Sequence, residues 1–170
     1  MRALLLTTQD LVAALQIVVP IYCTNGAPVL FGGGTPIDLG RCFPDNKRVF
    51  GDHKTIRGFL SGLVVGGIVG LLEAVLGRST RLFELAIIAS LGALLGDLGG
   101  AFAKRRLGIE PGRPLPGIDQ LDFVVGAIVA VSWIRMPSFG SLIILFCLTP
   151  PIHLLANFGA YKLGLKTTYW

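Results

Sequence analysis

Apolar stretches of about 20 residues recur along this chain, and they constrain its fold more than any other feature. Only 15% of the residues are charged, against about 25% in soluble domains, and the mean hydropathy is +0.70. These values predict an all-α integral membrane protein. Its 170 residues have room for roughly five spans of about 20 residues and for two substantial loops, but not for a separate soluble domain. We therefore expect residues 1–170 to form a single membrane-embedded domain.

Hydropathy predicts five transmembrane helices, at about residues 11–31, 56–76, 82–103, 118–136 and 139–163. The first apolar run imitates a signal peptide, but no A-x-A cleavage site follows it, so we interpret it as the first span. Two motifs, Asn25-Gly26-Ala27-Pro28 and Pro150-Pro151, are expected to break the first and fifth spans. Breaks of this kind are tolerated in membrane helices where they line a cavity or lie buried in protein.

The basic residues divide unequally between the two sides that these spans define. One side carries eleven Lys and Arg residues, which are Arg41, Lys47, Arg48, Lys54, Arg57, Lys104, Arg105, Arg106, Arg113, Lys162 and Lys166. The other side carries four, which are Arg2, Arg78, Arg81 and Arg135. The positive-inside rule therefore predicts a cytoplasmic C-terminus, two polar cytoplasmic loops and an outside N-terminus. The same division accounts for the net charge of +5 without nucleic-acid binding.

Glycines at small-xxx-small spacing mark the second and third spans. The two series are Gly62, Gly66 and Gly70, and Gly92, Gly96 and Gly100. Small residues at this spacing let helix backbones approach closely in a membrane. We expect both series to lie in helix interfaces.

Three carboxylates cluster at the predicted cytoplasmic face. Asp97 lies in the third predicted span, and an unpaired carboxylate there requires a wet cavity, a cation or a metal. The structural alternative is a pair between Asp97 and one of the nearby arginines. Asp119 and Asp122 are three residues apart at the start of the fourth span, so both face one side of a helix. They also suit the positive helix N-terminus without any metal. Together, however, the three would repel one another unless cations shared them, and the pattern favours Mg²⁺ holding a polyphosphate.

Basic residues near these carboxylates are candidate phosphate ligands. Lys104 follows Asp97 by seven residues, two helical turns along one face, so its ammonium is expected to enter the same cavity. Arg105 and Arg106 suit either phosphate or an inward-facing helix end. The segment from Gly51 to Gly58 contains Asp52, His53, Lys54, Thr55 and Arg57. Lys54 and Arg57 are spaced to bind phosphates from one helical turn, with Thr55 as a possible hydroxyl donor. A helix cap with charges that only set the membrane orientation is equally compatible with the spacing.

With these residues identified, the chain resembles the CTP-transferase family of phosphatidate cytidylyltransferases, most closely its archaeal branch. The resemblance rests on Thr24-Asn25-Gly26, Gly51 to Gly58, Gly96-Asp97, Lys104 to Gly108, Pro116 to Asp122, His153 and Asn157. Lys104-Arg105 and Asp119-x-x-Asp122 match the family signature. Ala101, Glu110-Pro111 and Gln120 stand where the signature has serine, a Lys-Asp pair and arginine. These departures favour the archaeal branch over the diacylglycerol enzymes.

The resemblance implies transfer of a cytidylyl group from CTP to 2,3-bis-O-(geranylgeranyl)-sn-glycerol 1-phosphate, an isoprenoid ether lipid, giving CDP-archaeol and pyrophosphate. It implies Mg²⁺ on Asp97, Asp119 and Asp122, with Lys104 also catalytic. It implies substrate and phosphate contacts for Asn25, Asp52, His53, Lys54, Thr55, Arg57, Arg105 and Arg106. His153 and Asn157 are weaker candidates.

Two other function classes would share some of these features. A small transporter or channel would also carry an intramembrane aspartate and broken helices. Its polar residues, however, should reach both membrane faces, whereas the polar residues here concentrate at one. A lipid kinase that uses CTP or ATP would share the magnesium and the basic clamp.

Overall fold

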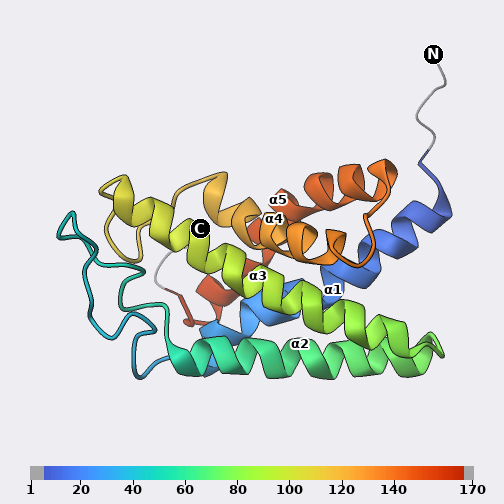
Figure 1. Ribbon diagram of the computed structural model, residues 1–170, viewed down its shortest axis with the longest axis horizontal. Helices are drawn as coiled ribbons and strands as arrows, with labels where there is room; N and C mark the ends of the chain where they lie inside the picture. Colours follow the sequence, from blue (N-terminus) through green and yellow to red (C-terminus); the bar gives the residue numbers. More distant parts are fainter. Residues whose placement is uncertain (1–5, 167–170) are drawn as a thin grey trace, which may run out of the picture.

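The computed structural model describes residues 6–166, and these form five α-helices without a named strand. The helices are α1 (Thr8–Phe31), α2 (Ile56–Leu76), α3 (Thr80–Arg106), α4 (Ile118–Ser132) and α5 (Phe139–Lys162). They form an elongated bundle, with the loops of residues 32–55 and 107–117 together at one end (Figure 1). The N-terminal end of α1 lies at the opposite end. The all-α prediction is confirmed.

Helix α1 is the centre of the bundle, because it packs against all four of the others. Its Ile17, Val18 and Ile21 join Phe123 of α4 and Leu145 of α5 in the apolar core. At the outer end, Thr7 and Asp10 form a capping box on α1. The Ser138 hydroxyl at the start of α5 donates to the same Asp10 carboxylate, which links the two helix N-termini.

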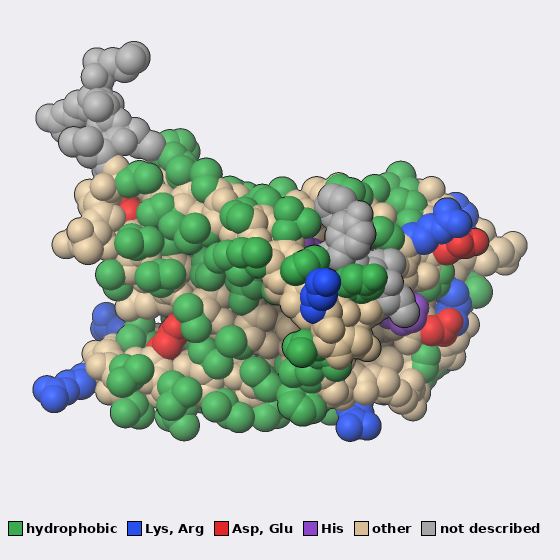
Figure 2. Space-filling model, turned by 180° about the vertical axis from the view of Figure 1, so that it is seen from behind, with side chains coloured by type: hydrophobic (Ala, Val, Ile, Leu, Met, Phe, Trp, Pro, Cys, Tyr) green, Lys and Arg blue, Asp and Glu red, His purple; other side chains and the backbone are tan. Residues whose placement is uncertain are grey.

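Four of the helices are long and apolar enough to cross a membrane, and they are α1, α2, α3 and α5. Their middle is covered by hydrophobic side chains, and most charged side chains lie toward the two ends (Figure 2). Helix α4 has 15 residues, or roughly 22 Å at 1.5 Å per residue, which is less than the ~30 Å hydrocarbon core. We predicted a fourth span to residue 136, but the helix ends at Ser132. Pro137 follows closely and disfavours helical backbone at the residue before it.

The expected breaks in the first and fifth helices are absent, since α1 and α5 continue through their prolines. Pro28 has no N–H for the carbonyl of Thr24, yet α2 approaches that carbonyl closely at Gly62. A Cβ built on Gly62 would lie 2.9 Å from the Thr24 oxygen. Near Pro150, the Tyr22 hydroxyl of α1 donates to the Thr149 carbonyl at 2.8 Å. Contacts from neighbouring helices are what allow proline inside membrane helices.

Glycine packing holds α2 and α4 against α3, as the spacing predicted. The buried residues of α2 are Gly58, Gly62, Gly66 and Gly70. A Cβ on Gly66 would lie 2.2 Å from the hydroxyl oxygens of both Thr24 and Ser90, which bond each other at 2.8 Å. On α3, Gly92, Gly96 and Gly100 instead face α4.

Gly66→Ala is therefore expected to destabilise the protein by about 1–3 kcal/mol, the usual effect of overpacking. The added methyl must displace the Thr24 and Ser90 hydroxyls, because α2 has no space on this face. The measurement is the thermal unfolding midpoint in detergent micelles. Gly99→Ala is the matched control, because a Cβ there has nothing within 4 Å. Equal midpoints for the two variants would contradict this account.

Candidate active site

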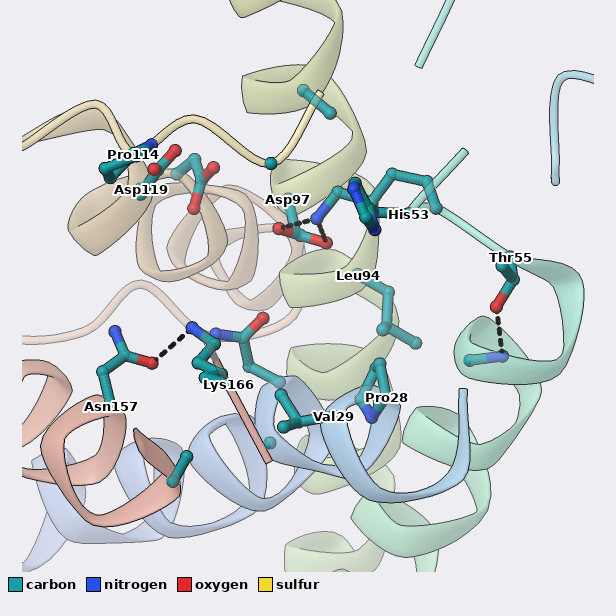
Figure 3. A pocket seen from close by; sticks show the side chains of 18 of the residues that line it. Pro28, Val29, His53, Thr55, Leu94, Asp97, Pro114, Asp119, Asn157 and Lys166 are labelled. Carbon is teal, nitrogen blue, oxygen red and sulfur yellow. Dashed lines mark hydrogen bonds and ion pairs between the residues drawn. The ribbon is translucent and has the colours of Figure 1, made fainter. Parts of the chain in front are cut away.

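A cavity of about 830 Å³ lies at the loop end of the bundle. The loop of residues 32–55, the loop of residues 107–117 and all five helices contribute to its wall (Figure 3). Most of the side chains predicted from the sequence line it. These are Asn25, His53, Lys54, Thr55, Asp97, Lys104, Arg105, Asp119 and Asp122, together with His153 and Asn157.

Two of the three carboxylates are held by lysines. Lys54 Nζ lies 2.6 Å from both carboxylate oxygens of Asp97, and Lys104 Nζ lies 2.8 Å from both oxygens of Asp119. The backbone N–H of Leu115 also donates to Asp119, at 2.8 Å. Helix α3 remains regular through Lys104, so this ammonium reaches the cavity as expected. Asp97 is partnered by a lysine from the first loop, whereas the alternative considered from the sequence was a nearby arginine.

The third carboxylate, Asp122, lies against the backbone of α3. A Cβ built on Gly100 would be 2.0 Å from Asp122 Oδ2 and 2.8 Å from its Cβ. Its Oδ1 accepts from the Phe123 N–H at 2.6 Å. Within residues 6–166, Asp122 forms no ion pair. The glycine at position 100 therefore makes the space that this carboxylate occupies.

Arg105 is a buried cation that forms no ion pair within residues 6–166. Its residue surface is 5% exposed, it lines the cavity, and its Nε and Nη1 have no hydrogen-bond partner among the described residues. Burying an unpaired charge costs several kcal/mol. A guanidinium left in this state within a cavity is suited to an anionic ligand.

Three of the residues expected in the site lie outside the cavity wall. Arg57 instead borders a separate groove on the outer side of α2. Asp52 accepts from Arg48 at 2.6 Å. Arg106 packs over Phe43 and Phe102 and donates to the carbonyls of Lys47 and Arg48, so it joins the first loop to the end of α3.

Thr55 lines the cavity, but its hydroxyl is the N-cap of α2 and accepts from the Gly58 N–H at 3.1 Å. Thr55 therefore caps a helix, as the structural alternative required. The phosphate alternative joined Lys54 with Arg57, and of these two only Lys54 lines the cavity.

The first loop is organised by Asp38, a residue that sequence reasoning did not single out. Its carboxylate accepts from the Arg48 guanidinium and from the backbone N–H groups of Gly40, Phe50 and Gly51. Burial would raise the pKa of Asp38, but these hydrogen bonds outweigh that effect and hold it well below its usual range. Asp38 thereby fixes the segment that leads into His53 and Lys54.

Asp38→Asn is expected to loosen this loop and to raise the KM for the anionic ligand about 10-fold, because one charge-assisted cluster is lost. In the wild type the pKa of Asp38 is lower folded than unfolded. Its stabilisation is therefore complete above about pH 4 and is lost as the pH falls further. Initial rates measure the KM, and limited proteolysis at pH 7 measures the loosening of the loop, with exposed Glu110→Gln as the control. Equal cleavage of Asp38→Asn and the wild type would contradict the assignment.

Three comparisons with known proteins show which family this chain belongs to. The sequence model of the CarS-like family, described as CDP-archaeol synthase, matches residues 7–170. The chain belongs to the CDP-archaeol synthase family.

Curated members of the CDP-archaeol synthase family match nearly end to end. The one from Thermococcus gammatolerans is 44% identical over 162 residues, which are 92% of this chain and 95% of the relative. The one from Methanocaldococcus jannaschii is 43% identical, over 94% of this chain and 97% of the relative. A solved structure reported as an intramembrane enzyme for archaeal membrane lipids biosynthesis superposes with a TM-score of 0.80 and 39% identity. The match covers 85% of the present chain and 92% of the chain of the solved structure.

CDP-archaeol synthases are nucleotidyltransferases, and membership of this family makes the chain an enzyme of lipid biosynthesis. Its four candidate spans and the intramembrane neighbour make it a multi-pass membrane protein. The transporter and the kinase are therefore the weaker of the functions that the sequence left open.

The cavity of this CDP-archaeol synthase family member supplies donors suited to a divalent cation. Within residues 6–166, no three His, Cys, Asp or Glu side chains already converge at metal-binding distances. Asp97, Asp119 and Asp122 nevertheless line one cavity, and carboxylate oxygens are the ligands that Mg²⁺ prefers. The ammonium groups of Lys54 and Lys104 lie beside Asp97 and Asp119, where they supply the positive charge that these carboxylates need. A bound Mg²⁺ would replace Lys54 and Lys104 as the partners of these carboxylates.

Lys166 is a further cavity residue, which the sequence suggested only as a topology charge. Its Nζ donates to Asn157 Oδ1 at 2.6 Å (Figure 3), and Asn157 Nδ2 lies 3.0 Å from His153 Nδ1. The only sequence signal was its position just after the fifth apolar run. That signal does not reveal that the chain turns back toward the cavity.

Proposed function

We propose that the chain transfers the cytidylyl group of CTP to the phosphate of an isoprenoid glycerol phosphate lipid in this cavity, using Mg²⁺. The relatives are named for CDP-archaeol, which implies an acceptor with two ether-linked isoprenoid chains and the release of pyrophosphate. We further propose that residues 1–170 act as one catalytic domain, with the loop end of the bundle facing the cytoplasm, where CTP is found.

The single observation that carries this proposal is the buried guanidinium of Arg105. It forms no ion pair within residues 6–166 and lines the same cavity as Lys54 and Lys104. A triphosphate would supply the missing negative charge, and charge-assisted hydrogen bonds to phosphate oxygens are among the strongest in proteins.

The lysines have alternative partners in this mechanism. When the triphosphate is bound, Lys54 and Lys104 exchange their contacts with Asp97 and Asp119 for phosphate oxygens. The released carboxylates, together with Asp122, would hold Mg²⁺. When bound, the metal neutralises charge on the phosphates and on the leaving pyrophosphate.

The bond changes require no protein nucleophile. An oxygen of the lipid phosphate attacks the α-phosphorus of CTP in line, a new P–O bond forms, and the bond to the bridging oxygen of the β-phosphate breaks. Pyrophosphate leaves with the electron pair. Lys54, Lys104 and Arg105 orient the reactants and stabilise the charge that moves onto the leaving group.

Positional labelling tests the proposal. Purified protein is incubated with Mg²⁺, the lipid phosphate, and CTP labelled on either the α- or the γ-phosphorus. We expect α-label in the lipid and none from γ-label. Transfer of γ-label would indicate a kinase instead. Absence of transfer of either label, with solute flux across reconstituted vesicles, would support a transporter.

A further inference from the structure

The chain beyond α5 turns back toward the cavity. The N–H of Gly164 donates to Tyr161 O at 3.0 Å, and the N–H of Leu165 donates to Ala160 O at 2.9 Å. These two bonds, with Gly164 at φ +71°, form a Schellman motif. The motif ends the helix and reverses the chain direction, so the next residue, Lys166, lies in the cavity wall.

Lys166 is held in a defined position there. Its ammonium donates to the side-chain oxygen of Asn157, which itself contacts His153 one turn earlier on α5. Burial lowers the pKa of Lys166, and the carboxylate of Asp119 acts in the opposite direction. The ammonium therefore lies within electrostatic range of the acidic cluster, although it belongs to a different wall of the cavity.

The two walls differ in chemistry. One wall carries Lys54, Lys104 and Arg105, from the first loop and α3. The other consists largely of apolar groups from α1, from α5 and from the turn that follows α5, including Val29, Leu30, Ala160, Leu163 and Leu165. Lys166 directly follows Leu165 in the chain and adds an ammonium group to this apolar wall. An amphipathic phosphate whose chains lie along α1 and α5 would place its headgroup beside Lys166.

We infer that Lys166 binds the phosphate of the lipid acceptor, whereas Lys54, Lys104 and Arg105 bind the triphosphate. This inference rests on the proposed function. Two polyanions must approach each other for the reaction, so a cation on the acceptor side reduces their repulsion. Asn157 positions the ammonium, since it holds the Nζ atom at hydrogen-bond distance.

Steady-state kinetics with both substrates varied test this inference, using Lys166→Gln, Lys166→Arg and the control Lys162→Gln. Lys162 carries the same charge four residues earlier, packs over Phe158 and does not line the cavity. For Lys166→Gln we expect the KM for lipid phosphate to rise about 10- to 100-fold, the value of one charge-assisted hydrogen bond. Lys166→Arg should recover most of this loss. The calorimetric Kd for CTP, measured without lipid, should stay within about twofold.

The outcomes separate this inference from the function itself. A weaker CTP Kd with an unchanged lipid KM would place Lys166 on the nucleotide side and overturn the inference. Unchanged kinetics for Lys166→Gln, or an equal loss in Lys162→Gln, would also overturn it. If the wild type itself transfers no α-label, the proposed function fails instead. Retained CTP binding shows that the variant is folded.

Discussion

Asp122→Asn is expected to lower kcat/KM for cytidylyl transfer by about 10²- to 10⁴-fold while leaving the folded yield unchanged. Within residues 6–166, Asp122 is the cavity carboxylate without a lysine partner, so a cation that binds there need not displace an ammonium group. Asparagine keeps the shape of the side chain and its contact with Gly100 but removes the charge. The measurement is the initial rate of α-label transfer to the lipid.

The matched control is Glu84→Gln, the same chemical change on the exposed surface of α3 near its other end. This variant should keep wild-type activity. An Asp122→Asn enzyme within about threefold of the wild type would exclude Asp122 from the metal site. Gly100→Ala tests the same carboxylate in a second way, because the added methyl group would overlap Asp122 Oδ2 and displace it. It should reduce activity in the same direction, whereas Gly99→Ala should not.

The spans could be predicted from the sequence because hydropathy alone determines them. The predicted second span, residues 56–76, coincides with α2. The exception is α4, whose apolar pattern continues past Ser132 although the helix does not. Hydropathy could not show this end, because the apolar residues continue beyond Ser132 with Trp133, Ile134 and Met136.

Most of the residues predicted for the site line one cavity, but their partners could not be predicted. Asp97 and Lys104 share a helical face, so their convergence follows from spacing within one element. The pairing of Lys54 with Asp97 joins residues 43 positions apart, and no local pattern contains that information. The same limit applies to Asp38 and Lys166, because a loop cluster and a chain reversal assign their roles.

The three adjacent basic residues at the end of α3 illustrate this limit most clearly. In the sequence, Lys104, Arg105 and Arg106 look equivalent as inward-facing charges. In the structure Lys104 pairs with the Asp119 carboxylate, Arg105 lines the cavity without an ion pair among the described residues, and Arg106 donates to carbonyls of the first loop. A helix turns by about 100° per residue, so neighbours in a basic run necessarily have different surroundings.

Arg105→Met is expected to raise the Kd for CTP about 100-fold or more, and to stabilise the protein without ligand. The two effects have one cause. The guanidinium is buried and forms no ion pair among the described residues, so an apolar side chain of similar length removes a desolvation cost in the protein without ligand. The same change removes a bidentate donor from the bound triphosphate. Arg105→Lys should recover little affinity, because an ammonium cannot replace a planar donor pair.

Calorimetry with CTP and Mg²⁺ measures the affinity of the Arg105 variants, and thermal unfolding without nucleotide measures their stability. Arg41→Gln, an exposed arginine of the first loop, is the control and should change neither quantity. A lower unfolding midpoint for Arg105→Met, with CTP affinity retained, would make Arg105 a structural residue and remove the main support for the nucleotide site. Opposite changes in stability and affinity would instead show that burial of this charge is maintained for the ligand, at the expense of the empty fold.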